Sequence, residues 1–89
     1  MELENLKISK MEIIVLGTGC AKCKSLEKIT KQAVNELNAN ATVIKEEDIQ
    51  KIMGYGIMRT PGLVIDGKVV LSGKLPGLDE MKNIITQNQ

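Results

Sequence analysis

Hydrophobic and polar positions along the chain alternate with two different periods. Four short segments are runs of β-branched and aliphatic residues, which is typical of strands, and the run at 11–16 is apolar enough for a central strand covered on both faces. Three other segments repeat their apolar residues every three to four positions, as amphipathic helices do. In chain order, the pattern predicts a strand at 11–16, a helix from about 20 or 21 to 37, a strand at 41–45, a short helix opened by residues 46–48, strands at 63–65 and 68–71, and a helix from 78.

Turn residues separate these segments. Gly17-Thr18-Gly19 ends the first strand, and Gly54 and Gly56 mark the end of the short helix. Asp66-Gly67 stands between the last two strands and is a pair that the two-residue type I′ hairpin favours. The resulting order is β-α-β-α-β-β-α, which predicts an α/β fold.

The length of 89 residues allows one domain with a core of modest size. Met11 opens the first convincing strand, so residues 1–10 are interpreted as an N-terminal extension and residues 11–89 as the domain. Residues 1–10 are too charged for the apolar centre of a signal peptide. The longest apolar run, at 13–17, is too short to span a bilayer. We therefore expect a cytoplasmic protein that does not enter a membrane.

Composition and charge argue against one class of partner. Tyr55 is the only aromatic residue, which makes base stacking on aromatic side chains an unpromising activity. The net charge of +1 leaves no overall electrostatic attraction to nucleic acid or to an anionic membrane. We expect no nucleic-acid partner.

The candidate chemistry is a Cys-x-x-Cys motif, Cys20-Ala21-Lys22-Cys23, at the start of the first predicted helix. On a helical wheel Cys23 lies roughly 50° from the centre of the apolar stripe and Cys20 roughly 110° from it. Cys23 should therefore face the core, and Cys20 the solvent. Free N–H groups and the positive end of the helix dipole stabilise a thiolate at Cys20. The geometry predicts Cys20 as nucleophile and Cys23 as the resolving thiol.

Other interpretations of the cysteine pair remain open at this stage. Free cysteines are often simply buried in a core. A Cys-x-x-Cys motif also supplies half of a zinc site, and its thiolates would bind Cu(I) or Zn²⁺, so a soft-metal carrier is the main alternative. The chain has no His and no further Cys, and we expect no resident metal. A third alternative is a partner-binding module without turnover.

Two separate segments resemble the small thioredoxin-like branch of the thioredoxin–glutaredoxin superfamily. They are Gly17-Thr18-Gly19-Cys20-Ala21-Lys22-Cys23 and Thr60-Pro61-Gly62-Leu63-Val64-Ile65-Asp66-Gly67-Lys68, followed by Gly73. With the matching order of elements, the resemblance covers about residues 11–87. It implies a thioredoxin-like fold with a four-stranded mixed sheet flanked by helices. It also implies a thiol–disulfide oxidoreductase of the protein-disulfide reductase type.

The resemblance extends to residues around the cysteines. Pro61 is expected in the cis form, with the main chain of Thr60 presented to the partner. The remaining residues expected at the substrate are Gly19, Ala21, Lys22 and Gly73. The partners implied are a disulfide-containing protein and a reductase or small thiol; we expect no cofactor and a monomeric protein. The tryptophan and proline that thioredoxins place around their cysteine pair are absent, so no particular substrate is implied.

Overall fold

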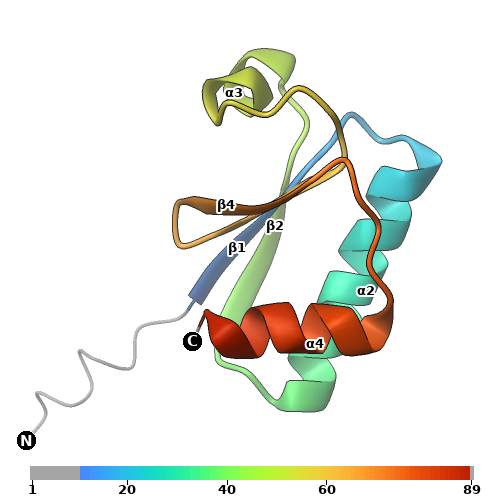
Figure 1. Ribbon diagram of the computed structural model, residues 1–89, viewed down its shortest axis with the longest axis vertical. Coiled ribbons are helices and arrows are strands. Elements are labelled where there is room, and N and C mark those ends of the chain that lie inside the picture. The colour runs from blue at the N-terminus through green and yellow to red at the C-terminus, as the bar shows by residue number, and fades with distance from the viewer. Residues whose placement is uncertain (1–10, 89) are drawn as a thin grey trace, which may run out of the picture.

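A computed structural model describes residues 11–88, and the extension predicted at 1–10 lies outside the described residues. Figure 1 shows a sheet with helices on both faces. The elements are β1 (Met11–Leu16), α2 (Ala21–Leu37), β2 (Ala41–Glu46), α3 (Ile49–Gly54), β3 (Gly62–Ile65), β4 (Lys68–Ser72) and α4 (Leu78–Gln87). This order, and the α/β class, confirm the prediction from the hydrophobic pattern.

The sheet is mixed and has the strand order β2-β1-β3-β4. β1 runs parallel to β2 and antiparallel to β3, which in turn pairs antiparallel with β4. The register aligns Leu16 with Glu46 and with Gly62, and Gly62 with Ser72. One end of the sheet therefore contains the carboxyl ends of β1, β2 and β4 and the amino end of β3, side by side.

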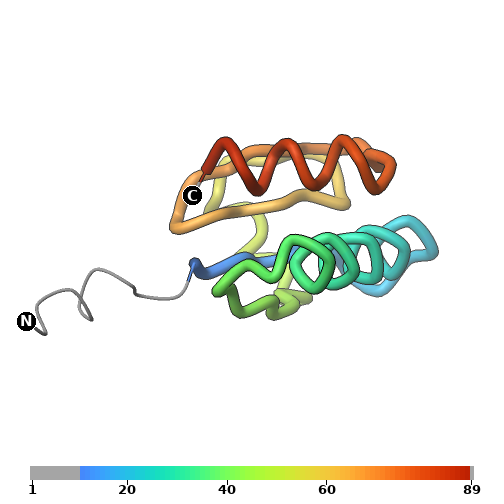
Figure 2. The backbone as a smooth tube through the Cα atoms, turned by 90° about the horizontal axis from the view of Figure 1, so that it is seen from below, coloured from blue at the N-terminus to red at the C-terminus, as the bar shows by residue number. Residues whose placement is uncertain are grey.

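Alternate residues of the two central strands build two separate cores, as the period of two in a strand requires. Ile13 and Val15 of β1 pack in one cluster with α2 and α4, whereas Leu16 belongs to a smaller cluster with Ile52 and Ile57 on the α3 side. Figure 2 shows α4 along the β3–β4 hairpin and α2 along β1. Both faces of β1 are thus covered, which explains its almost continuous apolar run.

Two polar contacts accompany the packing of α2 and α4. The hydroxyl of Thr30, fully buried, donates to the carbonyl of Leu26 at 2.7 Å, so no buried polar group is left unsatisfied there. The Lys82 ammonium lies 2.6 Å from the Glu36 carboxylate and joins the two helices at the surface. The hydrogen bond from Lys82 holds the pKa of Glu36 below its ordinary value.

The hairpin between β3 and β4 has the predicted turn. Asp66 and Gly67 both have positive φ, at 50° and 82°, as a type I′ turn requires. The Asp66 carboxylate also accepts a hydrogen bond from the N–H of Glu12 at 2.9 Å. The turn residues therefore tie the hairpin back to the first residues of β1.

The start of α3 differs from the prediction. The sequence pattern placed residues 46–48 in the first turn of this helix, but Glu46 is the last residue of β2, and α3 begins at Ile49. Pairing of Glu46 with Leu16 extends the parallel ladder by one residue, and this pairing was not visible in the local pattern. Asp48 is the N-cap, with its carboxylate accepting the N–H of Gln50 at 2.9 Å.

Replacing Asp48 by alanine is expected to lower the free energy of unfolding by about 1 kcal/mol, because the N–H of Gln50 loses its acceptor. Urea unfolding measures the change. Asp48→Asn keeps a side-chain oxygen in the same place and is expected to stay within about 0.5 kcal/mol of the wild type. An equal loss of unfolding free energy in both variants would show that the negative charge of Asp48, and not its capping hydrogen bond, stabilises the helix.

Candidate active site

The sheet register brings three loops that are distant in sequence to one end of the sheet. Gly17 follows β1, Pro61 precedes β3, and Gly73 follows β4, whose ends the register has placed side by side. The N–H of Gly73 donates to the carbonyl of Pro61 at 2.8 Å and ties two of these loops together. Figure 1 shows the β1–α2 loop, the segment before β3 and the β4–α4 loop at the same end of the sheet.

Cys20 occupies the N-cap of α2. Its backbone is extended, with φ −70° and ψ 168°, and its sulfur accepts the N–H of Cys23 at 3.3 Å. The N-cap is where helical N–H groups lack backbone partners and where the helix dipole is positive. Cys20 and Cys23 are joined by a disulfide, with their Cα atoms 5.1 Å apart. The structure therefore presents the oxidised form of the pair.

The two cysteines differ in burial as the helical wheel predicted. Cys20 is exposed, whereas Cys23 is 4% exposed. Cys23 packs directly against Gly17, where a Cβ atom would lie 2.7 Å from the Cβ of Cys23. Burial disfavours the charged form of a thiol, while the N-cap position favours it. The site thus contains one accessible sulfur suited to be a thiolate and one shielded sulfur beside it.

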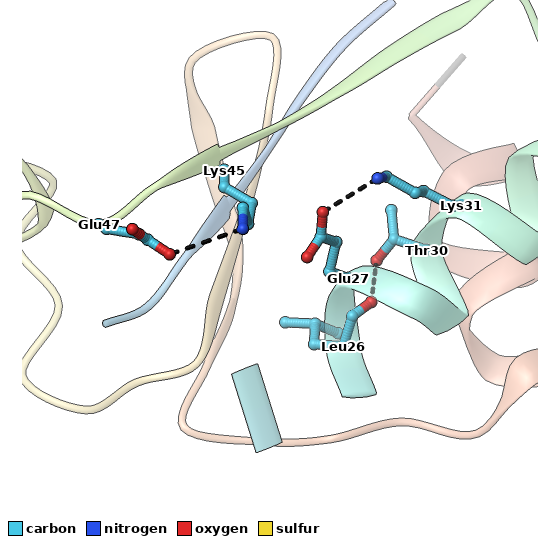
Figure 3. A network of polar contacts seen from close by, with 6 residues as sticks. All are labelled: Leu26, Glu27, Thr30, Lys31, Lys45 and Glu47. Carbon is cyan, nitrogen blue, oxygen red and sulfur yellow. Dashed lines mark hydrogen bonds and ion pairs between the residues drawn. The ribbon is translucent and has the colours of Figure 1, made fainter. Parts of the chain in front are cut away.

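A small cavity of about 20 Å³, room for roughly one water-sized molecule, lies beside Cys23. Its charged lining comes from α2 and from the end of β2, and comprises Lys24, Glu27, Lys45 and Glu47. Figure 3 shows Lys45 paired with Glu47 and Glu27 paired with Lys31, at 3.6 Å and 3.0 Å respectively.

Sequence reasoning did not single out Glu27, Lys45 or Glu47 as neighbours of Cys23. The available signal for Glu27 was its spacing, four residues after Cys23 on the same helix. Lys45 and Glu47 reach the cavity because β2 pairs parallel with β1, and no local pattern reports this pairing.

Thr60 and Pro61 precede β3, at the same end of the sheet as the loop that carries Cys20. The Thr60–Pro61 peptide bond is cis, and Pro61 is fully buried while Thr60 is exposed. Among residues 11–88, the N–H and C=O of Thr60 make no hydrogen bond. Exposed main-chain groups beside a site are available to pair with another chain.

The other residues expected at the substrate take different positions. Ala21 and Lys22 are exposed in the first turn of α2, next to Cys20. Gly19 has a φ of 93°, in the left-handed region that glycine tolerates, so it allows the turn from β1 into α2. Gly73 has a φ of 73° and packs against the side chain of Arg59, where a Cβ would lie 2.9 Å from the Arg59 Cβ. Through this packing and its hydrogen bond to the Pro61 carbonyl, Gly73 holds the loop before β3 in position.

This geometry, an asymmetric cysteine pair on the first helix of a mixed sheet, is that of a dithiol–disulfide redox protein. The family model of the thioredoxin domain matches residues 11–86. A thioredoxin from Methanothermobacter thermautotrophicus is 37% identical over 76 residues, covering 85% of this chain and 99% of that protein. A thioredoxin from Methanocaldococcus jannaschii is 37% identical over 70 residues, covering 79% and 80% respectively. The chain belongs to the thioredoxin family, and it is a thiol–disulfide oxidoreductase.

Solved structures agree on the fold. Chloroplastic thioredoxin z aligns with a TM-score of 0.69 at 19% identity, covering 94% of this chain and 87% of that chain. The germline-specific thioredoxin Deadhead from Drosophila melanogaster aligns with a TM-score of 0.65 at 15% identity, covering 97% and 89%. At these identities the likeness shows the architecture alone, which confirms the thioredoxin-like fold.

The alternative of a soft-metal carrier finds no support. Within residues 11–88, no three His, Cys, Asp or Glu side chains are grouped so that they could hold a metal ion. None of the helices described in the structure is long and apolar enough to cross a membrane.

Proposed function

We propose that this protein reduces disulfide bonds in partner proteins, with Cys20 as the attacking thiolate and Cys23 as the resolving thiol. The observation that carries the proposal is the asymmetry of the pair. Cys20 is exposed at the N-cap of α2, and Cys23 is 4% exposed one helical turn later. Only an accessible sulfur can meet a disulfide on another protein, and only a neighbouring sulfur can reach the resulting bond from inside.

The exchange runs in two steps that transfer two electrons. The Cys20 thiolate attacks one sulfur of the partner's disulfide, forms a mixed disulfide and releases the other sulfur as a thiolate. Cys23 then loses its proton and attacks the Cys20 sulfur. The mixed disulfide breaks, the partner leaves with its second sulfur as a thiolate, and the Cys20–Cys23 bond forms. The Cys20–Cys23 disulfide in the structure, with Cα atoms 5.1 Å apart, corresponds to the product of the second step.

Thr60 and the residues around Cys20 are proposed to orient the partner. Within residues 11–88 the N–H and C=O of Thr60 have no hydrogen-bond partner, so they are suited to pair with an extended segment as a neighbouring strand would. Gly19, Ala21 and Lys22 flank Cys20, and in this scheme they touch the partner near its reacting sulfur. Gly73 contributes by holding the Pro61 carbonyl.

Each turnover leaves the protein oxidised, so a reductase or a small thiol must restore the dithiol. The proposed setting is the cytoplasm, where thiols are kept reduced and a dithiol donor is useful. Electrons would then pass from that donor, through Cys23 and Cys20, to the partner's disulfide.

The test is alkylation of the reduced protein with iodoacetamide at a series of pH values, with each cysteine followed by mass spectrometry. Cys20 is expected to react first, with a pH midpoint below about 8.5, the pKa of an unperturbed thiol. Its position at the N-cap stabilises the thiolate, so its reactivity is retained as the pH falls toward neutrality. Urea-unfolded protein is the control, and both thiols should react alike there. Faster alkylation of Cys23 than of Cys20 in the folded protein would contradict the assigned roles.

A further inference from the structure

An apolar groove lies beside the site, between α3 and the segment that leads from α3 to Pro61. It encloses about 320 Å³, and its floor is formed by the buried side chains of Ile52 and Ile57. Thr60 lines one end of it. Figure 1 shows α3 and this segment at the same end of the sheet as the loop that carries Cys20. We call this feature the α3 groove.

The rim of the α3 groove is unusually exposed for apolar side chains. Ile49 is 53% exposed, Met53 66% and Met58 96%. Among residues 11–88, only Ile44 and Leu75 are other large hydrophobic side chains that are exposed, and neither lines the groove. Gathered apolar side chains on a surface mark an interaction site, and methionine adapts its shape to different partners.

The α3 groove is continuous with the redox site. Thr60 lines the groove, and within residues 11–88 its main-chain N–H and C=O make no hydrogen bond, which leaves them for the partner in the proposed function. An extended segment that pairs with Thr60 and brings its cysteine to Cys20 continues directly into the groove. The occupant that this continuity favours is therefore the segment of the partner that flanks its reacting cysteine.

The charge at the groove indicates a second property of that segment. Arg59 is the only charged residue that lines it, and within residues 11–88 no carboxylate pairs with its guanidinium. The Arg59 stem is held against Gly73, where an added Cβ would lie 3.1 Å from the Arg59 Cδ. A cation that is anchored by its stem and lacks a partner favours a carboxylate on the incoming chain.

We infer that the α3 groove selects partner segments in which a large apolar side chain and an acidic residue lie close to the reacting cysteine. The apolar side chain enters between Met53 and Met58, and the carboxylate pairs with Arg59. This inference rests on the proposed function, because it assigns the substrate class of the same site.

The experiment measures kcat/KM for eight synthetic peptides, each with its cysteine held as a disulfide to β-mercaptoethanol. The four combinations of leucine or serine at one position with aspartate or asparagine at the next are each made in two versions, with the pair before or after the cysteine. Wild-type protein is expected to prefer leucine over serine by about tenfold and aspartate over asparagine by about threefold. The aspartate preference should weaken as salt is added.

Two groove variants and one matched control separate the contributions. Met53→Ser/Met58→Ser is expected to abolish the leucine preference and keep the aspartate preference. Arg59→Met retains most of the stem and is expected to do the reverse. Ile44→Ser removes an equally apolar exposed side chain outside the groove and is expected to keep both preferences. Urea unfolding of each variant establishes that it is folded at the assay temperature.

Hydroxyethyl disulfide, which has no side chain to occupy the groove, distinguishes the two levels of the proposal. If the wild type does not reduce it, the proposed function fails. If the wild type reduces it but turns over the eight peptides equally, the groove inference alone is overturned. The groove inference is also overturned if the groove variants slow the reduction of hydroxyethyl disulfide and of the peptides alike. Sedimentation of a wild-type dimer that Met53→Ser/Met58→Ser dissociates would overturn it too, because a second copy would then occupy the groove.

Discussion

Replacement of Cys20 by serine is expected to abolish disulfide exchange, with a loss on the order of 10³-fold or more. Cys20 supplies the accessible thiolate at the N-cap, and a serine hydroxyl there is not ionised near neutral pH. Turnover with a dithiol as electron donor and a disulfide protein such as insulin as substrate measures the effect. Activity within tenfold of the wild type would show that Cys23 can attack by itself.

Replacement of Cys23 by serine is expected to give a different defect. Cys20 still attacks, but no neighbouring thiol resolves the product, so a covalent mixed disulfide with the partner accumulates. Non-reducing electrophoresis detects this complex, and added dithiol releases it. The double variant Cys20→Ser/Cys23→Ser is the matched control and should form no complex. Capture by Cys20→Ser rather than by Cys23→Ser would reverse the assigned roles.

Replacement of Gly17 by alanine is expected to have the second largest effect, a loss of about 1–3 kcal/mol in the free energy of unfolding. The new methyl group would lie 2.7 Å from the Cβ of Cys23 and still closer to its sulfur, so either the loop or the first turn of α2 must move. Because the same displacement shifts Cys23 relative to Cys20, closure of the disulfide should also slow. Urea unfolding and stopped-flow reoxidation measure the two effects.

Gly54 provides the control for this substitution. A Cβ at Gly54 meets nothing within 4 Å, and the residue ends α3 with no positive φ. Gly54→Ala is expected to be neutral or to stabilise the protein by up to about 1 kcal/mol. If Gly17→Ala were equally harmless, close packing of Cys23 on Gly17 would not be a requirement of the fold.

Local sequence patterns were enough to predict much of this molecule. The strand at Met11–Leu16, the type I′ turn at Asp66-Gly67 and the start of the last helix at Leu78 all depend on residues near one another in the chain. The opposite burial of Cys20 and Cys23 also follows from their positions on one helix. The predicted start of α3 was wrong, because the pairing of Glu46 with β1 outweighed its local preference.

The resemblance to the thioredoxin–glutaredoxin superfamily supplied what local patterns did not, the link between the cysteine pair and Thr60-Pro61. Thirty-nine residues lie between Cys20 and Thr60 in the sequence, and only the register of β1 with β3 explains why they lie at the same end of the sheet. The register of β3 with β4 accounts for the hydrogen bond from Gly73 to Pro61.

By itself, the sequence determined the order of the elements, the redox motif and the different exposure of its two thiols. Each of these depends on helical or strand periodicity and on turn chemistry, which act over a few residues. Only the tertiary structure decided which distant side chains meet, including Lys45 and Glu47 beside Cys23 and Met53 and Met58 around the α3 groove. Strand register and the packing of helices on the sheet determine those contacts, and a one-residue slip in register would have turned the opposite side chains toward the site.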